Sequence, residues 1–74
     1  MSVKEAMYNT ALAEFHSQRD KAIATARIYL EHPVGIGEHP QVIDEFIKQI
    51  KLAAEAEEAA SMLVDTFRDE ITQE

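Results

Sequence analysis

All the helix-breaking residues of this 74-residue chain fall in one short segment. The two prolines and two glycines are Pro33, Gly35, Gly37 and Pro40, and neither residue type occurs elsewhere. Glycine and proline are the residues that a helix interior tolerates least. Their placement predicts one helix over about residues 3–31, a loop over 32–39 and a second helix over about 40–71, all within a single domain, 1–74.

Both long segments carry apolar residues at spacings of three and four, which is the period of an amphipathic helix. Ser2 is a good N-cap for the first helix, because Glu5 occupies the capping-box position three residues later. The first stripe comprises Tyr8, Leu12, Phe15, Ala22, Ile23, Ala26, Tyr29 and Leu30. The second comprises Ile43, Phe46, Ile47, Ile50, Ala53, Ala54, Ala60, Leu63, Val64, Phe67 and Ile71.

The segment between the stripes has the features of a corner. Pro33 disfavours helical geometry at His32, whereas Pro40 suits the first position of a helix, with His39 as its N-cap. Glycine tolerates positive φ, which lets a chain reverse within a few residues. The sequence therefore predicts an all-α fold in which two helices lie antiparallel as a hairpin.

A hairpin of this length cannot bury both stripes, since the second helix carries more apolar surface than one neighbouring helix covers. We therefore predict that it dimerises into a four-helix bundle, a common arrangement for helical hairpins. Small residues at 53, 54, 56, 59 and 60 allow close approach of another helix. The predicted interface residues are Phe46, Ile50, Ala53, Ala60, Leu63 and Phe67.

One charge interrupts each stripe. Arg19 lies near the middle of the first stripe, and Glu57 lies between Ala53 and Ala60 on the second. The two charges can pair with each other, or Arg19 can pack its aliphatic stem while its guanidinium reaches solvent. The sequence leaves both readings open.

The loop also carries the one cluster of residues that suggests a metal site, namely His32, His39, Glu31 and Glu38. Their spacing matches no established metal motif. The Gly-x-Gly of the loop lacks the spacing of a nucleotide fingerprint, and no serine has a paired base. We expect no catalytic residue, no cofactor and no enzymatic activity, with a small-ligand or metal site at His32 and His39 as the alternative.

The charge balance limits the partners. Fourteen acidic against seven basic residues give a net charge of −7, which disfavours binding to nucleic acid. No apolar run has the length of a membrane span, and the N-terminus lacks the form of a signal peptide. We expect a cytoplasmic protein that binds neither membrane nor nucleic acid, with imitation of nucleic acid by the acidic second helix as a further alternative.

The segment HPVGIGEHPQVIDEF resembles a segment of small uncharacterised helical proteins of T4-type bacteriophages, including those of marine cyanobacteria. The resemblance implies a small all-helical protein in the cytosol of an infected bacterium and transfers no functional residue. The function expected from the sequence is a non-enzymatic helical interaction module that acts as a homo-oligomer and binds another macromolecule, an unidentified protein.

Overall fold

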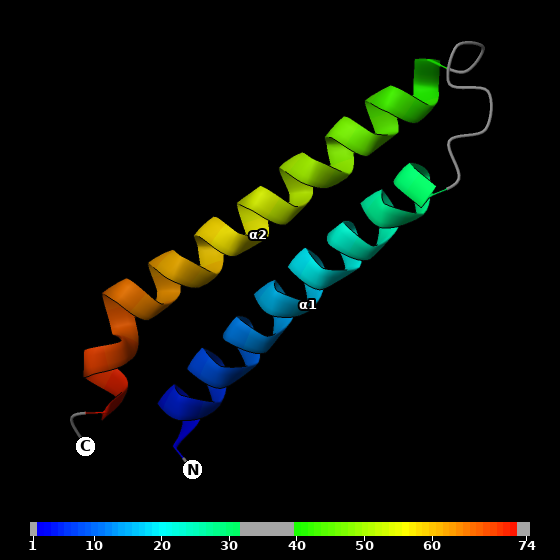
Figure 1. The fold of residues 1–74 in the computed structure, drawn as a ribbon. Coiled ribbons are helices and arrows are strands. Elements are labelled where there is room, and N and C mark those ends of the chain that lie inside the picture. Colours follow the sequence, from blue (N-terminus) through cyan, green and yellow to red (C-terminus); the bar gives the residue numbers. More distant parts are fainter. Residues whose placement is uncertain (1, 32–39, 73–74) are drawn as a thin grey trace.

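The protein is an all-α hairpin of two long helices, as the sequence predicts. The computed structural model describes residues 2–31 and 40–72, with α1 spanning Val3–Glu31 and α2 spanning Pro40–Thr72. The helices pack side by side in opposite directions, so that both chain ends lie at one end of the molecule (Figure 1). The predicted loop, residues 32–39, with its glycines and histidines, lies outside the described residues.

The start of α1 is fixed by a capping box. The backbone N–H of Glu5 donates to the Ser2 hydroxyl at 3.1 Å, and the backbone N–H of Ser2 donates to the Glu5 carboxylate at 3.5 Å. The Ser2 hydroxyl also lies 3.3 Å from this carboxylate. These bonds satisfy N–H groups that have no partner inside the helix, which confirms the predicted N-cap.

Both helices carry a stripe in which spacings of three and four alternate, the pattern of helices that pack nearly parallel to one another. In α1 the stripe is Tyr8, Leu12, Phe15, Arg19, Ala22, Ala26 and Tyr29. In α2 it is Phe46, Ile50, Ala53, Glu57, Ala60, Val64, Phe67 and Ile71. Each stripe thus has one charged residue.

The buried core of the hairpin consists of alanines. Among the described residues, Ala22 and Ala26 of α1 and Ala56 and Ala60 of α2 are only 3–4% exposed, and no large side chain is fully buried. We call these four residues the alanine core. Their small side chains let the two helices lie close together, so the larger side chains stand to either side of the contact line.

The hairpin is a thin rod. Its extents are 57 × 18 × 14 Å and its radius of gyration is 16.7 Å. A compact domain of this length would have a radius of gyration of about 11 Å. Neither helix is apolar enough over a sufficient length to cross a bilayer.

Candidate interaction surface

One group of large apolar side chains lies together on one side of the hairpin, toward the end of α1 and the start of α2, while other exposed apolar side chains lie elsewhere on the surface. Ile23 and Leu30 of α1 and Ile43 and Ile50 of α2 are 38% to 65% exposed, and Phe46 beside them is half-buried. We call these five residues the apolar face. Leu30, Ile43 and Phe46 line a common hollow of about 100 Å³, which shows that both helices contribute to it.

Helical geometry explains why these side chains lie together. Each residue advances about 100° around the helix axis. Relative to Ala22, both Arg19 and Ile23 lie to one side of the contact line, and relative to Ala56 so do Glu57 and Ile50. The apolar face therefore continues toward Arg19 and Glu57.

Arg19 and Glu57 form an ion pair between the helices. The Arg19 Nη1 donates to Glu57 Oε2 at 2.9 Å, and the Arg19 Nε donates to Asp20 Oδ1 at 3.0 Å. The Arg19 side chain is 27% exposed and that of Glu57 is 56% exposed. The two charges thus meet across the hairpin, as one reading of the sequence expected, but they do so at the surface.

The carboxylates also favour the charged form of Arg19. The hydrogen bond to Asp20 is the larger cause and the hydrogen bond to Glu57 the next, and both raise the pKa of Arg19 above its ordinary value. A raised arginine pKa keeps the guanidinium protonated at every pH at which proteins are normally studied. The ion pair therefore presents one fixed positive charge beside the exposed carboxylate of Glu57.

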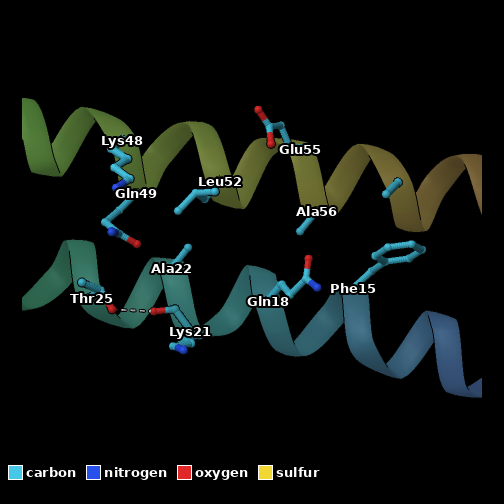
Figure 2. A pocket seen from close by; sticks show the side chains of 11 residues that line it. Phe15, Gln18, Lys21, Ala22, Thr25, Lys48, Gln49, Leu52, Glu55 and Ala56 are labelled. Atoms are coloured by element: carbon cyan, nitrogen blue, oxygen red, sulfur yellow. Dashed lines mark hydrogen bonds between the residues drawn. The ribbon is translucent and has the colours of Figure 1, made fainter.

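The opposite side of the hairpin carries a different kind of surface. A groove of about 580 Å³ runs between the helices there, with Ala22 and Ala56 pointing toward the opposite helices (Figure 2). Thr25 Oγ1 in this groove donates to the Lys21 carbonyl at 2.9 Å. Most side chains that line it are polar or charged, including Gln18, Lys21, Lys48, Gln49 and Glu55.

The six predicted interface residues fall into three groups in the structure. Ala60 is buried within the hairpin, Phe46, Ala53 and Leu63 are half-buried, and Ile50 and Phe67 are exposed. Their part in a dimer stays a prediction.

The predicted set omitted Ile23, Leu30 and Ile43, which belong to the apolar face. All three belong to the apolar stripes of the sequence, and Ile43 lies seven residues before Ile50, which is in the predicted set. Residues seven apart lie on the same side of a helix.

The metal-site hypothesis falls largely outside the described residues, since His32, Glu38 and His39 are not among them. Glu31 is the last residue of α1 and is exposed. Within residues 2–31 and 40–72, no group of three His, Cys, Asp or Glu residues is placed to hold a metal ion.

No family model, curated protein or solved structure matches this chain.

Proposed function

We propose that the protein is a non-enzymatic helical interaction module and that two hairpins pack through their apolar faces into a four-helix bundle. The observation that supports this most is the exposure of the apolar face, beside a hairpin core that consists of alanines. Alanine burial removes little apolar surface from water, whereas full burial of one isoleucine or leucine contributes about 1.5–3 kcal/mol. The hairpin thus leaves its largest source of stabilisation unused.

The exposed area matches what a second copy covers. The chain has an accessible surface of 5650 Å² at a mass of 8.3 kDa. A compact monomer of this mass exposes about 4,600 Å², so the excess is roughly 1,000 Å². A stable protein interface buries about 800 Å² on each partner. One further hairpin would therefore cover most of the excess.

The charge distribution also favours contact between two hairpins through the apolar face. Asp44, Glu55, Glu58 and Asp69 are exposed. By the 100° advance of a helix they lie away from the apolar face, on the outer side of α2 or toward the groove. These four carboxylates therefore do not oppose contact through the apolar face. They stay accessible on the outside of the proposed bundle. Binding of another macromolecule through them remains a prediction.

Sedimentation equilibrium of three proteins tests the proposal. The wild-type chain is expected to be a dimer at micromolar concentration. Replacing Ile50 with lysine places a charge on the apolar face and is expected to weaken association at least about tenfold, which corresponds to about 1.4 kcal/mol.

Leu52→Lys is the matched control. Leu52 is 43% exposed, close to the 47% of Ile50, but it lines the polar groove on the other side of the hairpin. Leu52→Lys is expected to remain dimeric. A folded wild-type monomer would contradict the proposal, and equal weakening by both changes would contradict the choice of face.

A further inference from the structure

The ion pair between Arg19 and Glu57 lies at the middle of the rod. Arg19 is the 17th of the 29 residues of α1, and Glu57 is the 18th of the 33 residues of α2. Each is the one charged residue of its stripe, and a hydrogen bond of 2.9 Å joins them. Each stripe therefore has a single charged position, and the two positions form one charged layer at the middle of the rod.

We infer that in the dimer this layer packs against the same layer of the second copy, so that two Arg19 and two Glu57 side chains meet at the centre of the bundle. The inference rests on the proposed function and adds the alignment of the two copies. If the two-fold axis of the dimer runs along the rod, the charged layers of the two copies lie at the same position along that axis. The apolar face lies wholly between this layer and the end of the rod where α1 ends and α2 begins, so only an axis along the rod lets the two apolar faces cover each other while the helices overlap fully.

The layer is chemically suited to meet its own copy. Arg19 and Glu57 are one positive and one negative group, so a two-fold related copy offers each of them a partner of opposite sign, while Asp20 keeps its own hydrogen bond to the Arg19 Nε. Arginine has five N–H donors, and Arg19 donates from Nε to Asp20 and from Nη1 to Glu57. The Glu57 side chain is 56% exposed, which leaves its carboxylate accessible to a second guanidinium.

The neighbours of the layer make any other alignment costly. Leu12 lies seven residues before Arg19, and Ile50 and Val64 lie seven residues before and after Glu57, on the same side of their helices. A shifted alignment would press the charges of one copy against these apolar residues of the other. Removing an ion pair from water costs free energy that an apolar neighbour does not restore, and single polar positions fix the register of coiled coils in this way.

Mixing two charge variants tests the inference. Arg19→Glu gives a chain with two acidic groups in the layer, and Glu57→Arg gives a chain with two basic groups. Each homodimer then gathers four like charges, whereas the mixed dimer gathers two of each sign. We expect native mass spectrometry of an equimolar mixture to show a ratio of mixed dimers to homodimers about tenfold above that of random pairing, a preference of about 1.4 kcal/mol.

A matched control mixture uses charges on the outer side of α2. Lys51→Glu and Glu58→Lys change the net charge of each chain by the same amounts, at two exposed residues away from the apolar face. Their dimers are expected to pair at random. Random pairing of the Arg19→Glu and Glu57→Arg chains as well would overturn the inference.

A second variant decides the matter if either single change prevents folding. The double exchange Arg19→Glu with Glu57→Arg keeps an ion pair within each hairpin but reverses its direction. Mixed with wild-type chain, it is expected to depart from random pairing, because only contact between the layers of two copies senses the reversal. Random pairing here would overturn the inference, whereas a wild-type chain that sediments as a monomer would instead contradict the proposed dimer itself.

Discussion

At the scale of single residues, the capping box of Ser2 and Glu5 gives the most direct prediction. Ser2→Ala removes the acceptor of the Glu5 N–H at 3.1 Å and leaves that group without its cap. We expect the free energy of unfolding to fall by about 1 kcal/mol. Urea denaturation at a fixed protein concentration measures this loss, because stability depends on concentration if the chain associates.

Ser17→Ala is the control for the cap, since Ser17 is exposed within α1 and alanine is the better helix former. It is expected to leave stability unchanged or slightly higher. Equal losses from both changes would show that the Ser2 hydroxyl has no special role.

The two kinds of residue contact differ in how far the sequence predicts them. The contact of Ser2 with Glu5 spans three residues, so a local pattern is enough to identify it. The contact of Arg19 with Glu57 depends on the relative alignment of two helices joined by residues 32–39, and periodicity within one helix carries no information about that alignment. The sequence therefore identified both charges as interruptions of a stripe without determining that they pair.

At the scale of the helices, the alanine core controls how closely α1 and α2 approach. Ala22→Leu inserts a larger side chain at a position that is 3% exposed. Overpacking of this kind costs about 1–3 kcal/mol, and we expect a loss of this size in urea denaturation.

Ala24→Leu is its control, because Ala24 is exposed on the same helix two residues away. It is expected to change stability by less than about 0.5 kcal/mol. A similar loss at both positions would contradict the view that the alanine core sets the spacing of the helices.

The helices themselves were predictable because glycine and proline are confined to residues 33–40 and the apolar period runs through both segments. Their bounds, Val3–Glu31 and Pro40–Thr72, lie within one residue of the expected ranges. The division of each stripe between core and surface was not predictable in the same way. Two cylinders touch along a narrow line, so only part of each stripe is buried between them, and Ile23 and Ile50 remain exposed although both belong to the apolar stripes identified in the sequence.

At the scale of the whole molecule, a rod with an alanine core and an uncovered apolar face is an incomplete hydrophobic structure. Pairing of two rods side by side doubles the mass while it leaves the length almost unchanged. Association end to end would instead nearly double the length. Mass and longest dimension together therefore separate a four-helix bundle from both the single hairpin and an end-to-end assembly.

Small-angle X-ray scattering of the wild-type chain at micromolar to millimolar concentration measures both quantities in one experiment. We expect a particle with twice the 8.3 kDa mass of one chain and a longest dimension close to the 57 Å of the single hairpin. A particle with the mass of one chain at every concentration, or one with twice the mass and a length near twice 57 Å, would contradict the side-by-side homodimer.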